Sequence, residues 1–182
     1  MTGVNRRRAM SRPLAIGVGL FVAAAAAMTY FFFFDWSSVR EASEEEARRI
    51  LASAVDEAGG DAPYIVIDET GVVTVNRDQE HDEPVGFGTL RLMAWLPEEE
   101  RVLTLDYPHW FVRLKTMSSL NLGTMIAAAL RDWEQLDLSV SYDDLRRRGP
   151  GLLLDHRQAG GVRIVLWSTS KSGGRPSIRD AS

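Results

Sequence analysis

Asp106, His109 and two serines lie close together in the middle of the chain and are its best candidates for catalysis. Two residues separate Asp106 from His109, one of them a proline, and Ser118 and Ser119 follow. An imidazole held by a carboxylate can take a proton from a serine hydroxyl, as in a nucleophilic hydrolase. The spacing opposes that role, because Asp106 and His109 lie in an extended run around the proline and serines before a helix usually cap it. We expect His109 to be a strand-end residue bonded to the backbone or to Asp106.

A second candidate is an acidic loop, residues 77–84, whose side chains suit a divalent cation. Carboxylates and imidazole together can hold such an ion, but a calcium loop spaces its oxygens regularly and turns at a glycine. This loop has neither feature. We expect a solvated loop that offers a docking surface to a basic partner, and the sequence predicts no metal or other cofactor. The potential ligands are Asp78, Glu80, His81, Asp82 and Glu83.

Three consecutive arginines, Arg146, Arg147 and Arg148, lie at the predicted C-terminal end of a short helix. Cations at that position complement the helix dipole, so a solvated helix end is the first interpretation. As a patch in an acidic domain they are also the best candidate for an anion contact. The nearby Asp155 and His156 cannot easily share one site, because adjacent strand residues point to opposite faces.

The strand predicted over 87–96 has one apolar face and one mixed face. Alternation places Leu90, Leu92, Ala94 and Leu96 on the apolar face. The mixed face consists of Thr89, Arg91, Met93 and Trp95. Trp95 is exposed there unless a helix or a partner covers it, and exposed aromatic side chains favour interfaces. We therefore predict that the mixed face is the contact surface of the domain.

Strands and two principal helices must position these residues. A capping box at Ser38 and Glu41 begins the first helix, which ends at the glycines 59–60. Apolar residues three and four apart predict the second helix over 121–136, and a short third helix follows at 141–148. We assign the tryptophans of these elements, at positions 95, 110, 133 and 167, to the core or its edge. Helices segregated from mainly antiparallel strands make an α+β domain. The predicted strands cover 64–68, 72–76, 87–96, 102–107, 109–115, 138–140, 152–156 and 162–168.

The segment from Leu14 to Phe34 contains 21 residues without a charge and is almost wholly apolar. At about 1.5 Å of rise per residue, a helix of this length covers roughly 31 Å, close to the hydrocarbon thickness of a bilayer. Four arginines precede the segment, and aromatic residues that include Trp36 cluster at its far end. The positive-inside rule then places the N-terminus in the cytoplasm and the rest of the chain outside.

A cleaved signal peptide is the alternative, because the alanines at 23–27 would satisfy a small-residue cleavage rule. The apolar stretch is longer than the roughly 7–15 residues of a signal h-region, and cleavage there would leave four phenylalanines near the new N-terminus. We therefore predict an uncleaved signal anchor that binds the lipid bilayer through residues 14–34. A cytoplasmic domain would require the charge rule to fail.

The part of the chain beyond the span is acidic. The whole chain has a net charge of −4, and four of its arginines precede the span, so the remainder carries −8. Such a domain is repelled by nucleic acid and by anionic lipid, which excludes nucleic-acid binding. The chain has no cysteine, which excludes disulfides and thiol nucleophiles. We predict a basic cytoplasmic segment at 1–13, the span at 14–34, a juxtamembrane helix at 35–60, an extracytoplasmic α+β domain at 61–168 and a disordered tail at 169–182.

No motif of known mechanism occurs in the sequence. Its organisation favours a non-catalytic, membrane-tethered domain that binds another envelope protein or supports an assembly. The alternative is a membrane-anchored hydrolase or metal-dependent enzyme that uses Asp106 with His109, or the loop around His81. An enzyme should place two of these groups in one concave site, whereas a binding module should leave them apart and expose a patch.

Overall fold

The computed structural model describes residues 36–115, 120–130, 138–158 and 160–170. The chain divides into two compact units, Met1–Trp36 and Ser37–Ser182. The predicted membrane span and most of the predicted tail lie outside the described residues, and no helix within the described ranges is long and apolar enough to cross a membrane. The second unit is an α+β domain with a mainly antiparallel sheet and several helices, as the sequence predicts.

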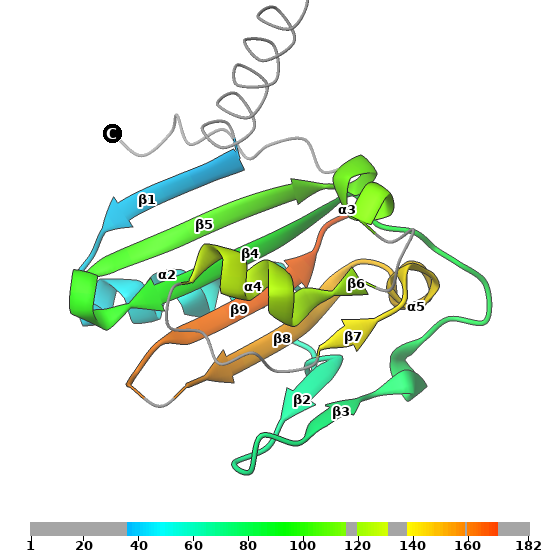
Figure 1. Cartoon of the computed structure of the whole chain (residues 1–182), viewed down its shortest axis with the longest axis horizontal. Coiled ribbons are helices and arrows are strands. Elements are labelled where there is room, and N and C mark those ends of the chain that lie inside the picture. Colours follow the sequence, from blue (N-terminus) through cyan, green and yellow to red (C-terminus); the bar gives the residue numbers. More distant parts are fainter. Residues whose placement is uncertain (1–35, 116–119, 131–137, 159, 171–182) are drawn as a thin grey trace, which may run out of the picture. The chain divides into compact units, whose positions relative to one another are not determined.

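The domain is built on a five-stranded sheet in which every pair of neighbouring strands is antiparallel (Figure 1). The central strand β4 pairs Leu92 with Leu105 on one side and with Leu166 on the other. Aligned apolar residues of three strands thereby share one face, as alternation requires. In sheet order the strands are β1 (Ser37–Glu41), β5 (Arg101–Pro108), β4 (Thr89–Leu96), β9 (Arg163–Ser168) and β8 (Gly151–Arg157).

Helix α2 (Glu44–Glu57) covers one face of this sheet and lies behind it in Figure 1. Its buried residues Ala47, Leu51 and Ala54 are four and three residues apart and form one apolar stripe. Together with Ala42 and Ala58, that stripe packs on residues of four strands, β4, β5, β8 and β9. The sheet side of this cluster consists of Trp95, Val102, Leu152, Val165 and Trp167.

Shorter elements cover the other face, and α4 lies in front of the sheet in Figure 1. Buried side chains from β4, β8 and β9 meet Ile126 of α4 and Leu145 of α5 in the larger apolar cluster of the domain. The elements on this side are α4 (Leu122–Ala129), α5 (Tyr142–Arg148) and two small antiparallel sheets, β2 (Ile65–Ile67) with β3 (Val73–Val75) and β6 (Leu120–Asn121) with β7 (Ser139–Val140).

The first helix does not begin where the sequence predicts. Residues Ser37–Glu41 form strand β1, and α2 begins only at Glu44, with the Ser43 side chain accepting a hydrogen bond from the Glu46 amide at 3.3 Å. The prediction of a helix over 35–60 with a capping box at Ser38 is therefore wrong over residues 37–43. The reason is tertiary, because pairing with β5 satisfies the β1 backbone and Ala42 donates to the Glu100 carbonyl.

The strand predicted over 109–115 is a helix, α3 (His109–Lys115). Strand β5 runs to Pro108, which pairs with Thr89 at the very start of β4, so the sheet offers no partner beyond this point. The chain turns away as a helix instead. Trp110 is 49% exposed, which corrects its assignment to the core, whereas Val112 is buried.

Several local predictions are confirmed. The hairpins β2–β3 and β8–β9 form, and the second turns through two glycines with positive φ at 160–161. Helix α5 begins with a capping box in which Ser141 and Asp144 satisfy each other's backbone amides. The helix predicted over 121–136 begins as expected, with Asn121 as its cap, but ends at Ala129. Two further 3₁₀ turns occur, η1 (Arg77–Gln79) and η2 (Pro97–Glu99).

Candidate functional site

The residues of the predicted catalytic pair are engaged in separate contacts. Asp106 forms an ion pair with Arg91, whose Nε lies 3.0 Å from the carboxylate, and Arg91 also donates to Glu57 of α2 at 3.1 Å. His109 is hydrogen-bonded through Nε2 to the Tyr142 hydroxyl. The sequence did not indicate this side-chain partner on α5, and the serines at 118–119 lie outside the described residues.

The acidic loop is attached to α5 by one of its own carboxylates. The buried Tyr64 donates its hydroxyl proton to Glu80 at 2.6 Å, and Arg77 bridges Glu80 and Asp144, at 3.1 and 3.3 Å. Burial raises the pKa of the Tyr64 hydroxyl, and the bond to Glu80 raises it further. In addition, the amide of His81 donates to a backbone carbonyl of α5. This part of the loop therefore has a structural role.

The rest of the acidic loop stays open to solvent. Asp78, His81, Asp82 and Glu83 are exposed, whereas Glu80 faces Tyr64. Among the described residues, no group of three or more histidines and carboxylates is arranged to hold a metal ion. The docking role of these four side chains remains a prediction.

The three consecutive arginines do not form one patch. Arg146 lies over the Tyr142 ring, with its guanidinium carbon 6.0 Å from the ring centroid, and Arg147 is exposed. Arg148 is only 7% exposed and donates to the Pro150 carbonyl. Successive helical residues point about 100° apart, so three in a row diverge around the axis. A single anion contact made by all three is therefore wrong.

Arg148 also explains a glycine in the following strand. Gly151 has a φ of +144°, and a side-chain carbon added there would lie 2.6 Å from the Arg148 guanidinium. The positive φ favours glycine at this position, and any larger residue would also displace the Arg148 guanidinium.

The predicted contact surface at Thr89, Arg91, Met93 and Trp95 lies on the face of β4 that α2 covers. Trp95 is 6% exposed and packs under α2, and Arg91 is tied to the same helix through Glu57. Trp95 is thus covered by a helix of its own domain and is not exposed to a partner, whereas the other three side chains are partly buried. The signal that could have shown this is the alanine and leucine stripe of α2, which needs an apolar face of matching width to cover.

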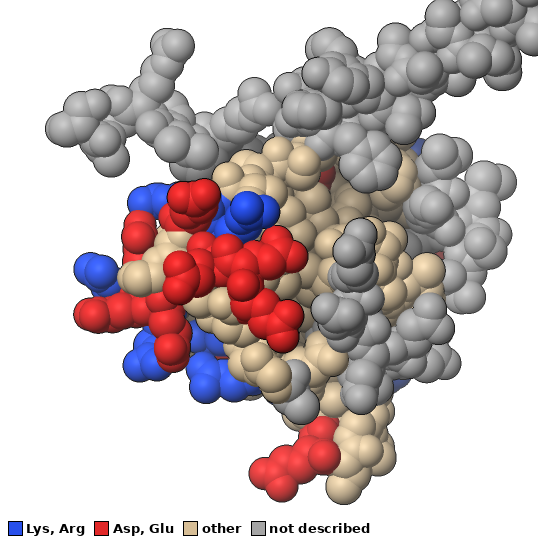
Figure 2. Space-filling view, turned by 60° about the vertical axis from the view of Figure 1, so that its left-hand side comes forward, with Lys and Arg blue, Asp and Glu red and all other residues tan. Residues whose placement is uncertain are grey.

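The sequence reasoning missed a surface at the end of the sheet where β4 passes into β5. Here Glu41 pairs with Arg101, and the amide of Ala42 donates to the Glu100 carbonyl at 3.0 Å, so two acidic segments lie side by side. We call this surface the acidic end. Most of the acidic side chains visible in Figure 2 gather there. Its glutamates are Glu41, Glu44, Glu45, Glu46, Glu98, Glu99 and Glu100.

A hollow of about 160 Å³ opens beside the acidic end, between α2 and the β8–β9 turn. Two of its arginines have carboxylate partners: Arg48 pairs with Glu44 at 2.9 Å, and Arg163 binds Asp155 through two nitrogens. The bond to Asp155 raises the pKa of Arg163. We call this the arginine hollow; it is lined by Glu44, Arg48, Leu51, Trp95, Pro97, Arg157, Gly161 and Arg163.

Arg157 is the arginine of the hollow with an open guanidinium. Among the described residues, none of the ion pairs includes it, although it lies directly opposite Arg163 in the β8–β9 register. The hollow therefore combines an available cation with a nearly closed floor, because Leu51 and Trp95 are only 1% and 6% exposed. Such a site can accept an acidic side chain that carries an aliphatic stem.

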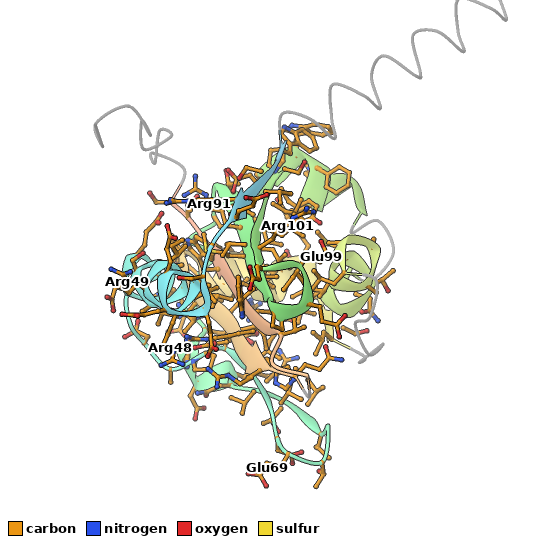
Figure 3. All side chains as sticks on the ribbon, turned by 90° about the vertical axis from the view of Figure 1, so that its left-hand side faces the viewer. Arg48, Arg49, Glu69, Arg91, Glu99 and Arg101 are labelled. Atoms are coloured by element: carbon orange, nitrogen blue, oxygen red, sulfur yellow. The ribbon has the colours of Figure 1, made fainter. Side chains whose placement is uncertain are left out.

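Figure 3 looks onto the acidic end and the helix beside it. Arg48 and Arg49 extend from α2, and Glu99 and Arg101 come from the turn between β4 and β5. Glu69 lies far from them, at the tip of the β2–β3 hairpin. Charges of both signs thus surround the hollow.

The opposite end of β5 carries aromatic rings. Tyr107 stacks on Phe111 with ring centroids 5.8 Å apart, and Trp110 meets Phe111 edge-on at 6.1 Å. Burial raises the pKa of the Tyr107 hydroxyl, whereas Trp110 is half exposed. We call these three residues the aromatic end.

Comparison with protein-family models, with curated proteins and with solved structures finds no match for this chain. The function must therefore be argued from the surfaces of the domain themselves.

Proposed function

We propose that the protein is a single-pass membrane anchor that carries an extracytoplasmic, non-catalytic domain for binding another envelope protein. The proposal combines the uncharged segment at 14–34 and the arginines before it with an α+β domain that has its own core. In this arrangement the first 13 residues lie in the cytoplasm and residues 37–182 lie outside it. The domain then acts as a docking module held at the membrane.

The observation that carries the docking role is the arginine hollow within a rim of glutamates. Specific protein contacts need a cavity for an anchoring side chain and a polar rim that excludes water around it. The hollow supplies the cavity over Leu51 and Trp95, and the acidic end supplies the rim. Its volume of about 160 Å³ suits one side chain better than a drug-sized ligand.

The charges specify what the partner must present. Arg157 is exposed and can bind a carboxylate, so the residue that enters the hollow is a glutamate or an aspartate. Around it, the glutamates at 44–46 and 98–100 favour lysines and arginines on the partner, although Glu44, Glu46 and Glu99 already pair with arginines of the domain. A short segment with one acidic residue between basic ones meets both conditions.

The alternative of a hydrolase receives less support. A general base must lie within hydrogen-bond reach of the group that orients it. Asp106 is paired with Arg91 on one side of the sheet, whereas His109 is bonded to Tyr142 of α5. No observation on the described residues favours the enzymatic function over docking.

Site-specific photo-crosslinking in native membranes tests the proposed function. A photoreactive residue in place of Glu99 should give a discrete crosslinked product in the full-length protein, whereas the same residue in place of Glu69 should give none. Glu69 is the matched control because it is an exposed glutamate at the distant hairpin tip. Absence of a product at position 99, or equal products at both positions, would show that the acidic end is not a docking surface.

The role of the hollow is tested by Arg157→Glu in the same assay. The product at position 99 should decrease by about 10-fold or more, since like charges at a rim disfavour association and a buried charge pair is lost. Arg147→Glu, an exposed arginine on α5, is the control and should leave the product unchanged. A product that survives Arg157→Glu would place the contact on the acidic end without the hollow.

A further inference from the structure

Strand β1 determines which end of the domain lies nearest to the preceding chain. Its first residue, Ser37, pairs with Leu105, and β1 and β5 run in opposite directions. With strands about 4.8 Å apart and residues about 3.4 Å apart along them, Ser37 lies roughly 15 Å from His109, the first residue of α3. The last residue of β1, Glu41, lies at the acidic end instead. The chain therefore enters the domain at its aromatic end.

The connection between the proposed span and β1 is short. Ser37 follows Phe34 by three residues, which an extended chain covers in about 10 Å. Ser37 must then lie within about 10 Å of the apolar core of the bilayer, whose headgroup layer is itself roughly 5–8 Å thick. The start of β1 is therefore the part of the domain that follows the proposed span most closely along the chain, and the start of α3 lies near it within the domain.

The side chains at this end are those that favour a membrane interface. Trp110 is 49% exposed and is the largest of the exposed apolar side chains among the described residues. It contacts Phe111, which stacks on Tyr107. Tryptophan and tyrosine concentrate at the headgroup level, because each has an apolar ring and a polar group that stays hydrated.

The charges along the domain favour the same orientation. Helix α3 contains Arg113 and Lys115, whereas the acidic end, with seven glutamates of which three pair with arginines, lies at the other end of β5, eight residues away. At about 3.4 Å per residue, that separation is roughly 27 Å, well over a Debye length at physiological salt. An anionic surface attracts the first group and repels the second.

From these observations we infer that the aromatic end rests on the lipid headgroups, with Trp110 and Phe111 inserted among them, and that the acidic end and the arginine hollow point away from the membrane. The inference rests on the proposed function, because it requires the anchor at 14–34. It adds a second membrane contact that fixes the orientation of the docking surface.

Fluorescence quenching on single-cysteine variants tests this orientation, and the absence of native cysteine leaves each label unique. The full-length protein is reconstituted into vesicles of phosphatidylcholine and phosphatidylglycerol, with nitroxide-labelled lipid as the quencher from the membrane and iodide as the quencher from water. Ala24→Cys labels the span, Arg113→Cys the aromatic end and Glu99→Cys the acidic end. We expect nitroxide-labelled lipid to quench the labels at positions 24 and 113 severalfold more than the label at position 99. Iodide should quench the label at position 99 more than the label at position 113.

The outcomes separate the anchor from the orientation. A label at position 24 that lipid does not quench would overturn the proposed anchor. If lipid quenches the label at position 24 but not the label at position 113, the anchor stands and the inferred orientation of the domain is wrong. This holds whether water or a second protein covers the aromatic end. In the Arg113→Cys background, Trp110→Ser should reduce lipid quenching severalfold, and Trp110→Phe should retain most of it. Equal quenching in these two variants would also contradict the inserted ring.

Discussion

The two ends of strand β5 differ in how the fold holds them and in what they expose. At the acidic end, charged residues lie on the surface above a closed apolar layer of Leu51 and Trp95. At the aromatic end, part of the apolar layer itself is open, because Trp110 is half exposed. Charges at the first end need no partner to be stable in water, whereas the rings at the second end lose free energy to exposure. The two ends therefore differ in the kind of neighbour that each can contact.

The largest expected difference between the ends concerns stability. Leu51 of α2 is 1% exposed and belongs to the same apolar cluster as Trp95, so Leu51→Ala should lower the free energy of unfolding by about 2–5 kcal/mol. Trp110→Ala should lower it by only about 1 kcal/mol, since half of the side chain is already in water and the rest contacts Phe111. Urea titration of the full-length protein in detergent micelles, followed by tryptophan fluorescence and circular dichroism, measures both. A loss at Trp110 as large as that at Leu51 would mean that the aromatic end belongs to the core.

A smaller effect tests whether the acidic end also serves the fold. The Ser43 side chain caps α2, and the glutamates at 44–46 complement its dipole. Ser43→Ala should lower the free energy of unfolding by about 1 kcal/mol, because the Glu46 amide loses its acceptor. Ser53→Ala, in the middle of the same helix, is the matched control and should be neutral or slightly stabilising. If both substitutions had the same effect, Ser43 would not be the cap.

The start of α2 also shows what local sequence cannot decide. Two Ser-x-x-Glu patterns occur in succession, Ser38 with Glu41 and Ser43 with Glu46, and each predicts a helix start. The second is the real one, because residues 37–41 find a partner in β5. The presence of that partner depends on the whole fold, so no inspection of the segment alone could choose between the two serines.

The same limit explains the other differences. Alternation in 87–96 correctly separated Leu90 and Leu92 from Trp95, but it could not say that α2 covers the second face. Residues 109–115 alternate like a strand, yet β5 has no partner past Pro108 and α3 forms instead. Hairpins and caps were predictable because their signals are local, as with Ser141 and Asp144 in α5. The arginine hollow was not, since it joins residues of α2, the β4–β5 turn and the β8–β9 hairpin.

The smallest expected effect is a loss of stability at acidic pH in α5, the helix that contacts α3 at the aromatic end. His109 of α3 is bonded to Tyr142 in the first turn of α5, where the ionised Asp144 closes the capping box. Burial acts to raise the pKa of Asp144, but hydrogen bonds from the amide and hydroxyl of Ser141 and from Arg77 outweigh it and leave the pKa lowered. A carboxyl whose pKa is lower in the folded state stabilises the fold above its unfolded pKa of about 3.9, and this contribution is lost as the pH falls through the folded value.

Asp144→Asn should therefore lower the free energy of unfolding by about 0.3–1 kcal/mol at neutral pH, the usual range for a charge at a helix N-terminus. The difference from the unmodified protein should decrease as the pH falls below about 3.9, because the native carboxyl then begins to be protonated and to resemble the amide. Asp143→Asn is the matched control, since Asp143 is exposed and pairs with Arg146 only at 3.6 Å. Urea titrations between pH 7 and pH 3 give the three curves. A deficit in Asp144→Asn that persists unchanged at pH 3 would show that geometry, and not the charge of Asp144, holds α5 beneath the aromatic end.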